Sequence, residues 1–248
     1  MKVIILAAGK GKRLHSDESG VPKCMALADG RPLLSYVLDY TSFVPDADKI
    51  IVVGYRREVI EAYLPGFRFA VQLEQKGTGD AVMAAYPYLK DYDGDVFVIN
   101  GDMPLLRQES LESLMELHES EHNDCSMLTY FEDGELPPFG RVIRGADGRV
   151  CDICEFKDAS ESVRAIRELN VGVYLFDSRK LFSALAGLEP SAATGEYYLT
   201  DVPKAILRAG GRVNGLCLRS SDEVGGVNTP EDLEKVSEIL KKRKAGSL

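Results

Sequence analysis

Residues 3–13 read VIILAAGKGKR, an apolar run that passes directly into a loop of glycines and cations. Such a run, bounded by a Gly-rich turn, predicts a buried strand at 3–7. Glycine lets backbone N–H groups approach an anion and the cations add opposite charge, so the loop is chemically suited to phosphate. It is neither the dinucleotide-binding fingerprint, because Leu14 replaces the third glycine, nor a P-loop, because Arg13 follows Lys12 where Ser or Thr is required. A turn that uses glycine only for its shape is the alternative.

Strands and helices continue to alternate through the first half of the chain. Apolar runs predict further strands, and a 3.6-residue period predicts helices between them, at residues 33–43 (helix), 49–54 (strand), 58–64 (helix), 69–73 (strand), 79–89 (helix), 96–100 (strand), 108–122 (helix) and 125–131 (strand). This order is typical of βα units on a mainly parallel sheet. Ligands of such sheets bind beyond the carboxyl ends of the strands, so we expect the loops after Ala7, Leu73 and Asn100 to converge.

The pattern changes after Phe131. A turn at Asp147-Gly148 between two short apolar segments predicts a hairpin, and more strands and helices follow. The expected elements are strands at 141–144, 150–155, 170–176 and 213–218 and helices at 178–185, 198–209 and 230–244. The chain has no repeat, low-complexity linker or Pro-rich boundary, so any two lobes should share one sheet or pack closely.

Composition narrows the class of protein. The formal net charge of −9 argues against a general nucleic-acid binder, although a few cations at one cleft can still hold an anionic ligand. No apolar run is long enough to span a bilayer, and the amino terminus fits a signal peptide poorly. Five cysteines at irregular spacing indicate reduced thiols. We therefore expect a cytoplasmic protein with no nucleic-acid or membrane partner.

Polar groups suited to a nucleotide follow the predicted strands. Gln72 ends one strand, and its amide can both donate and accept, which suits a nucleobase edge. The turn 77–79, Gly-Thr-Gly, then opens a helix with backbone donors that face the cleft. The alternative is a helix start with Thr78 as its cap, which is compatible with a binding role. Asp102 follows the strand at 96–100 and is a hard ligand of the kind Mg²⁺ requires, or else a turn cap. Lys23 can reach the same cleft as a flexible cation, or remain solvated.

Nine segments together resemble a known family. In order they are LAAGKGKR, Pro22-Lys23, QLEQKGTGDA, GDMPL, FGRVIR, EFKDA, ELNVG, GEYYLTD and EVGGVN. From residue 1 to about residue 235, the sequence resembles the uridylyltransferase domain of the bifunctional bacterial N-acetylglucosamine-1-phosphate uridylyltransferases. One such motif is weak evidence, but nine in the same order are specific.

The resemblance implies an α/β fold of the Rossmann-like nucleotidyltransferase type, with a mostly parallel central sheet, helices on both faces and a smaller β-rich sugar-binding lobe. It implies a single domain with a nucleotide-binding half at 1–132, a sugar-binding half at 133–229 and a C-terminal helix at 230–248. The implied reaction joins UTP to N-acetylglucosamine 1-phosphate with Mg²⁺ and releases pyrophosphate.

Position by position, the resemblance also implies roles for individual residues. The catalytic cations are Arg13 and Lys23. The nucleotide-binding residues are Leu6, Ala7, Ala8, Gly9, Gly11, Gln72, Gly77 and Thr78. The sugar-binding residues are Asn100, Gly140, Glu155, Asn170 and Thr200, and the magnesium ligands are Asp102 and Asn228. In-line attack by a sugar-phosphate oxygen on the α-phosphorus then requires alignment and charge stabilisation, with no covalent enzyme intermediate and no dedicated general base.

The chain departs from the family pattern in places. It stops at Leu248, so we expect neither the acetyltransferase domain of the bifunctional enzymes nor the trimer that this domain builds, and no oligomeric state is predicted. Lys12 stands where the family usually has Thr, and segment 15–21 looks longer. The alternatives are a transferase for another sugar 1-phosphate or nucleoside triphosphate, and a non-catalytic nucleotide-sugar-binding regulator, which the intact Lys23, Asp102 and Asn228 disfavour.

Three other patterns receive structural interpretations. His118–His122, HESEH, matches the HExxH zinc signature, but it ends a predicted helix and no further ligand motif follows, so we interpret it as helix-end histidines. Cys151 and Cys154 lie on one predicted strand with their thiols on opposite faces, so we interpret them as two strand cysteines. Residues 241–244, KKRK, are interpreted as the solvated face of the last helix.

Overall fold

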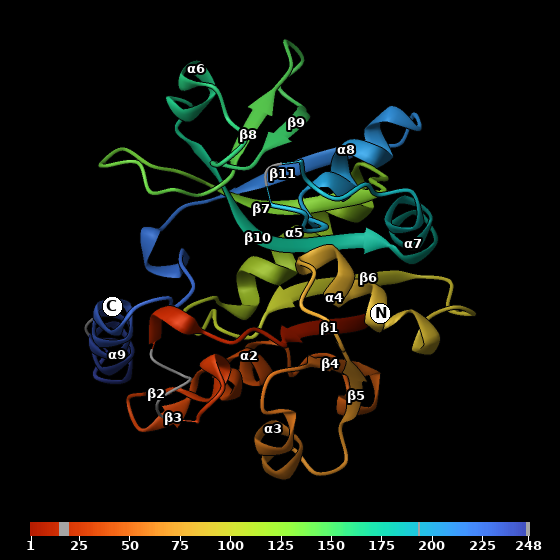
Figure 1. The fold of residues 1–248 in the computed structure, drawn as a ribbon. Helices are drawn as coiled ribbons and strands as arrows, with labels where there is room; N and C mark the ends of the chain where they lie inside the picture. The colour runs from red at the N-terminus through yellow and green to blue at the C-terminus, as the bar shows by residue number, and fades with distance from the viewer. Residues whose placement is uncertain (15–19, 193, 247–248) are drawn as a thin grey trace.

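One sheet forms the centre of the molecule, and nine strands join it within the described residues (Figure 1). The structure is a computed structural model that describes residues 1–14, 20–192 and 194–246, without the side chain of Lys12. Most of the segment 15–21 therefore lies outside the described residues. The main path of the sheet runs β11-β7-β10-β6-β1-β4-β5.

The first half of the chain supplies a parallel part of this sheet. Its strands are β1 (Lys2–Ala7), β4 (Lys49–Val53), β5 (Arg68–Val71) and β6 (Asp95–Asn100). β1 pairs in parallel with β4 on one side and with β6 on the other. The strand order thus reverses beside β1, and the carboxyl ends of β1 and β6 diverge into the crevice where such sheets bind ligands.

The second half extends the same sheet. β7 (Cys125–Phe131) and β11 (Val213–Leu218) are parallel to each other, whereas β10 (Glu168–Asp177) is antiparallel to both β6 and β7. The predicted hairpin is formed by β8 (Arg141–Arg144) and β9 (Val150–Cys154), and it joins the sheet where β8 pairs with β10. The expectation that both halves share one sheet is confirmed.

Helices cover both faces of the sheet. They are α2 (Leu33–Tyr40), α3 (Arg57–Tyr63), α4 (Thr78–Ala84), α5 (Gln108–Ser120), α6 (Glu161–Arg164), α7 (Ser178–Ala186), α8 (Asp201–Arg208) and α9 (Pro230–Lys244). Short 3₁₀ turns lie at Lys12–Leu14, Lys23–Met25, Asp46–Asp48, Tyr86–Tyr88 and Ser221–Glu223. The predicted α/β architecture is confirmed. None of the helices in the described residues is long and apolar enough to cross a membrane.

Several boundaries and short elements differ from the prediction. The helix expected at 79–89 ends at Ala84, and the turn after it contains Pro87, which lacks a backbone donor. The strand pair β2 (Leu27–Ala28) and β3 (Arg31–Pro32) was not predicted. α6 was not predicted either, because elements of two to four residues are too short to show a hydrophobic period.

Two apolar layers lie on opposite faces of the sheet. Successive β1 residues alternate between them: Ile4 packs with α4, α7 and α8, whereas Val3 and Ile5 pack with α2, α3 and α5. All three side chains are fully buried, which explains why the strand reads as a continuous apolar run. A third cluster joins Val236 and Leu240 of α9 to Leu33 of α2.

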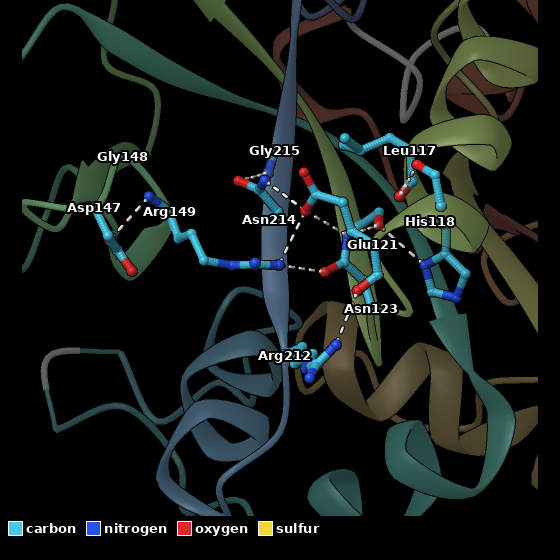
Figure 2. A network of polar contacts seen from close by, with 12 residues as sticks. Leu117, His118, Glu121, Asn123, Asp147, Gly148, Arg149, Arg212, Asn214 and Gly215 are labelled. Carbon is cyan, nitrogen blue, oxygen red and sulfur yellow. Dashed lines mark hydrogen bonds and ion pairs between the residues drawn. The ribbon is translucent and has the colours of Figure 1, made fainter.

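A polar network attaches the hairpin to the main sheet (Figure 2). Arg149, beside the hairpin turn, donates to Glu121 Oε2 and Asn123 Oδ1, each over 2.9 Å. Asn214 of β11 donates to the same Glu121 oxygen over 2.8 Å. His118 lies within this region, with Nδ1 3.0 Å from Ser126 Oγ. The turn of the hairpin is therefore anchored to β11 and to the end of α5.

The start of α9 is defined by a capping box. Thr229 Oγ1 accepts from the Asp232 N–H, and the Asp232 carboxylate accepts from the Thr229 N–H. The same carboxylate accepts from the Asn228 N–H over 2.9 Å. In Figure 1, α9 lies on the side to which the arrowheads of β1 and β6 point. The cap thus holds Asn228 near the carboxyl ends of the central strands.

The interpretation of 241–244 as a solvated face is wrong for Arg243. This guanidinium donates to the backbone oxygens of Leu105 over 2.6 Å and Asp222 over 2.8 Å. Lys244 forms an ion pair with Asp29. The sequence of a charged run at a helix end does not reveal whether distant backbone carbonyl oxygens will accept hydrogen bonds from it.

Replacing Thr229 with Ala should lower the free energy of unfolding by about 1 kcal/mol, because the Asp232 N–H loses its acceptor. Urea unfolding followed by far-ultraviolet circular dichroism measures this change, since the chain has no Trp. Thr229→Ser keeps the hydroxyl and should remain within error of the original protein. Equal losses in both variants would contradict a capping role.

Candidate active site

A cleft of about 990 Å³ opens at the carboxyl ends of β1, β5 and β6. The three loops that the sequence expected to converge do so here, and this expectation is confirmed. The cleft is lined by Leu6, Ala7, Ala8, Gly9, Lys10, Gly11, Arg13, Lys23, Cys24, Gln72, Gln75, Gly77, Thr78, Ala81, Asn100, Asp102, Lys157, Glu196 and Tyr198. Every residue assigned above to catalysis or nucleotide binding lies in this set.

The loop after β1 is held open over the cleft. The backbone oxygen of Ala8 accepts from the Tyr55 N–H over 3.2 Å and from Gln75 Nε2 over 2.7 Å. A Cβ at Gly54 would meet Ala8 at 3.1 Å, which is tighter than ordinary contact, so this close approach favours glycine. At Gly9 an added Cβ would meet nothing within 4 Å. Because Gly9 has no side chain and open space beside it, a phosphate can approach its backbone.

Four charged or polar side chains meet at one side of the cleft. The Lys23 ammonium forms an ion pair with the Asp102 carboxylate and donates to Asn228 Oδ1 over 2.8 Å. Arg13 donates to the same Asn228 oxygen over 3.1 Å. The backbone N–H of Val227 donates to the Asp102 carbonyl over 3.0 Å. Oxygen atoms of Asp102 and Asn228, which are far apart in the sequence, thus meet at one ammonium.

A glycine permits this approach. A Cβ at Gly226 would stand 3.2–3.3 Å from the Asp102 carboxylate, which is tighter than ordinary contact. Asp102 and Asn228 are close because the segment between the 3₁₀ turn at Ser221–Glu223 and α9 lies against the turn after β6. A carboxylate and an amide oxygen around a cation are hard ligands of the kind that bind magnesium.

The cleft also contains a thiol next to these cations. Burial, with a smaller contribution from the Asp102 charge, raises the pKa of Cys24 to about 12. Cys24 is therefore a neutral thiol near neutral pH. Because the thiolate is the nucleophilic form, Cys24 is unsuited to covalent catalysis.

Gln72 and Thr78 differ from the roles that the sequence allowed. Both hydrogens of the Gln72 amide are used within the protein, by Gly77 O over 3.0 Å and by Asp80 Oδ2 over 2.8 Å, so Gln72 offers a ligand an acceptor and no donor. The helix cap position is Gly77, so the alternative role of Thr78 as cap is wrong. Thr78 Oγ1 instead accepts from the Leu199 N–H over 2.9 Å, which ties the two halves together.

A second hollow of about 230 Å³ adjoins the first. It is lined by Asn100, Asp102, Met103, Phe139, Asn170, Val171, Gly225, Gly226 and Asn228. Asn100 and Asp102 line both hollows. Asn170 Nδ2 donates to the Tyr174 hydroxyl over 2.6 Å, and Asn170 Oδ1 accepts from the Gly172 N–H over 3.0 Å. The backbone of Gly140 accepts from the Asn170 N–H over 2.9 Å. Of the residues assigned to the sugar, Asn100, Gly140 and Asn170 thus meet here.

Glu155 and Thr200 form a separate pair. Thr200 Oγ1 donates to Glu155 Oε1 over 2.8 Å. Burial raises the pKa of Glu155, and the Thr200 hydrogen bond opposes this effect in part. The Glu155 charge also contributes, after burial, to the raised pKa of Tyr174, which in turn accepts from Asn170. The pair is therefore coupled electrostatically to the second hollow.

Arg141 organises the segment that carries Gly140. Its guanidinium donates to the backbone oxygens of Pro137 over 3.1 Å, Phe139 over 2.6 Å and Arg164 over 3.0 Å, and the residue is 1% exposed. The sequence predicted this position only as part of a strand. No sequence signal distinguishes a buried arginine that pairs with carbonyl oxygens from one on a solvated strand.

Other cleft residues were also missed. All five lie inside the segments that carry the resemblance, so their positions were available in the sequence although no role was assigned: Lys10, Gln75, Lys157, Glu196 and Tyr198. Glu196 and Tyr198 reach the cleft because residues 196–198 pack against Gly77, where an added Cβ would meet the Tyr197 backbone at 2.5 Å. That contact joins segments 120 residues apart and has no local signature.

The HESEH segment lies at the end of α5, and the CxxC segment lies on β9. His118 is buried on α5, whereas His122 lies beyond the end of the helix with φ of 51°. In the parts of the chain that the structure describes, no group of three or more His, Cys, Asp or Glu side chains is placed to hold a metal. Cys151 and Cys154 both lie on β9 as free thiols. The structural interpretations of both segments are confirmed.

The fold and the cleft define a nucleotidyltransferase: a sheet with a strand-order reversal, a glycine loop over the crevice, and cations beside paired oxygen ligands. Residues 3–205 match the MobA-like NTP transferase domain, and the chain belongs to that family. The chain is 42% identical over 241 residues to the Bifunctional protein GlmU of Streptococcus suis (strain 98HAH33) and 37% identical over 244 residues to that of Pelotomaculum thermopropionicum (strain DSM 13744 / JCM 10971 / SI).

These alignments cover 97% and 98% of this chain and 52% of each relative. The Bifunctional protein GlmU of Brevibacillus brevis (strain 47 / JCM 6285 / NBRC 100599) is 38% identical over 246 residues, which is 97% of this chain and 51% of that protein. The chain thus spans about half the length of the curated relatives it matches.

Replacing Arg141 with Met should lower the free energy of unfolding by about 3 kcal/mol, because three backbone carbonyl oxygens lose the buried guanidinium that donates to them. Urea unfolding measures the loss. Arg141→Lys should recover only part of it, since one ammonium cannot reproduce the planar fork of a guanidinium. A change below 0.5 kcal/mol in Arg141→Met, the scale of ordinary surface substitutions, would contradict this role.

Proposed function

We propose that this protein transfers a uridylyl group from UTP to N-acetylglucosamine 1-phosphate, giving UDP-N-acetylglucosamine and pyrophosphate. The observation that carries the proposal is the junction of the two hollows, which share Asn100 and Asp102 beside the Lys23 ammonium. Two anionic substrates that must meet at one phosphorus atom require this arrangement. The similarity to proteins named Bifunctional protein GlmU across nearly the whole chain supports the same substrates.

The two halves divide the substrates between them. We assign UTP to residues 1–132, with its phosphates over the loop from Ala8 to Gly11 and its base at Gln72 and Gly77. The sugar is assigned to residues 133–229, in the hollow of Asn100 and Asn170 beside Gly140 and toward Glu155 and Thr200. The helix α9 (Pro230–Lys244) follows Asn228. A cytoplasmic location suits both substrates.

The chemistry follows from alignment and charge. An oxygen of the sugar phosphate attacks the α-phosphorus in line, and pyrophosphate leaves from the opposite side. Arg13 and Lys23 stabilise the negative charge that develops on the phosphate oxygens. The attacking phosphate is already an anion near neutral pH, so no side chain has to remove a proton from it. Cys24, a neutral thiol, takes no part in group transfer.

The cofactor that fits this site is Mg²⁺, held by Asp102 and Asn228. Their oxygen atoms already converge on a cation, the Lys23 ammonium, so the site is electrostatically suited to positive charge. Two oxygen ligands from the protein suit magnesium, which takes its remaining ligands from phosphates and water. When bound, the ion neutralises charge on the phosphate oxygens.

Pyrophosphate release with Mg²⁺, measured over a grid of nucleoside triphosphates and sugar 1-phosphates, tests the proposal. Release for UTP with N-acetylglucosamine 1-phosphate is the expected result. Turnover confined to another pair would retain the mechanism and reject the substrates. Nucleotide binding without turnover in any pair would favour a regulatory protein.

Replacing Asp102 with Asn should lower kcat by on the order of 100-fold, because the site loses its one carboxylate oxygen ligand. The magnesium concentration that gives half-maximal rate should rise in parallel. Asp133→Asn makes the same chemical change at an exposed residue outside both hollows and should leave both quantities unchanged. Normal turnover and magnesium dependence in Asp102→Asn would reject the assignment.

The raised pKa of Glu155 predicts a pH dependence. As the pH falls through this raised pKa, the carboxylate takes up a proton and loses an acceptor for sugar hydroxyls. The kcat/KM for the sugar 1-phosphate should therefore fall on acidification in the original protein. Glu155→Gln cannot titrate, so only the ionisation of the substrate phosphate, near pH 6, should remain. Identical acid limbs in both proteins would contradict this role.

A further inference from the structure

The hydrogen bonds that the described residues make with the Gln72 side-chain amide all involve its nitrogen. It follows β5 and is 7% exposed, and its nitrogen lies between two oxygen atoms, Gly77 O at 3.0 Å and Asp80 Oδ2 at 2.8 Å. Asp80 lies in the first turn of α4. The start of α4 therefore packs against the Gln72 amide, which follows the end of β5. Within the described part of the chain, no donor reaches Gln72 Oε1.

The orientation of this amide follows from chemistry. A backbone carbonyl and an ionised carboxylate can only accept hydrogen bonds. Turning the Gln72 amide over would bring its oxygen against both of these acceptors and lose two hydrogen bonds. The nitrogen must therefore face Gly77 and Asp80, and the oxygen is the polar atom left for the cleft.

An acceptor held in this way distinguishes between pyrimidines. Uracil presents an N–H at ring position N3, whereas cytosine presents an unprotonated nitrogen there. The Gln72 oxygen can accept from the first and repels the second. A Gln that was free to turn over would serve both bases equally well, because its amide carries a donor and an acceptor.

We propose that Asp80 is a specificity-determining residue, which accepts a hydrogen from Gln72 and thereby keeps the Gln72 oxygen toward the base, so that the cleft accepts uracil and rejects cytosine. This inference rests on the proposed function for the place of the base. It assigns Asp80 a positioning role, because Asp80 acts through Gln72 and needs no contact with the nucleotide.

The test is the ratio of kcat/KM for UTP to that for CTP. In Asp80→Asn, the new amide can donate to the Gln72 oxygen and release the orientation, so the ratio should fall about tenfold, the size of one hydrogen bond. Asp80→Ala, a second variant, should also lower the ratio. Glu74→Gln removes a carboxylate from the same loop, where Glu74 pairs with Lys76 at the surface, and should leave the ratio unchanged. General damage to the fold would weaken UTP and CTP alike and would not move the ratio.

Calorimetric binding of UTP, CTP and N3-methyl-UTP to the original protein separates this inference from the proposed function. Preferential binding of UTP, lost on N3-methylation and reduced in Asp80→Asn, supports the inference even if no sugar 1-phosphate is turned over. A UTP preference that is the same in the original protein and in both Asp80 variants would overturn it while the proposed function stands. Equal binding of UTP and CTP to the original protein would also overturn it.

Discussion

The ion pair between Lys23 and Asp102, with Asn228 as a second acceptor, is the interaction on which the site depends. It joins the turn after β6 to the segment before α9 and to a residue near the start of the chain. Without the ammonium, the Asp102 carboxylate would lose its ion pair, and Asn228 Oδ1 would keep the hydrogen bond from Arg13. Lys10, Arg13 and Lys157 also line the cleft, so it carries an excess of cations in a protein whose net charge is −9.

The sheet makes this convergence possible. Since both faces of β1 are covered by helices, the strand is fixed, and the loops at its carboxyl end have little freedom to move apart. The reversal of strand order beside β1 opens the crevice between the loops. β10 lines the second hollow with Asn170 and Val171 and pairs with β8 of the hairpin. The network around Glu121 anchors that hairpin to β11 (Figure 2). Strands of one sheet thus carry residues of both hollows, which fixes the position of one hollow relative to the other.

The sequence predicted the long elements well and the contacts between them poorly. Strands such as 96–100 and helices such as 108–122 carry a clear period because each buries an apolar face, and they appear as β6 and α5 with small changes at their ends. Two interpretations of single side chains were wrong, because Arg243 is bonded to carbonyl oxygens and Thr78 is not a helix cap. The Gln72 amide, which the sequence left free both to donate and to accept, uses both of its hydrogens within the protein. In each case the partner is set by how two segments pack, which no local pattern records.

The sequence by itself determined the order of strands and helices, the glycine loop after β1 and the residue types that reach the cleft, because these depend on local period and backbone freedom. Only the tertiary structure decided which of those groups meet. Lys23 and Asn228, which are bonded to each other, lie 205 residues apart in the sequence, and Gly77 and Tyr197, which are in contact, lie 120 residues apart. Such contacts arise from the packing of whole elements. The direction of the Gln72 amide was likewise decided by packing, since the side chain is identical in either orientation until Gly77 and Asp80 close around it.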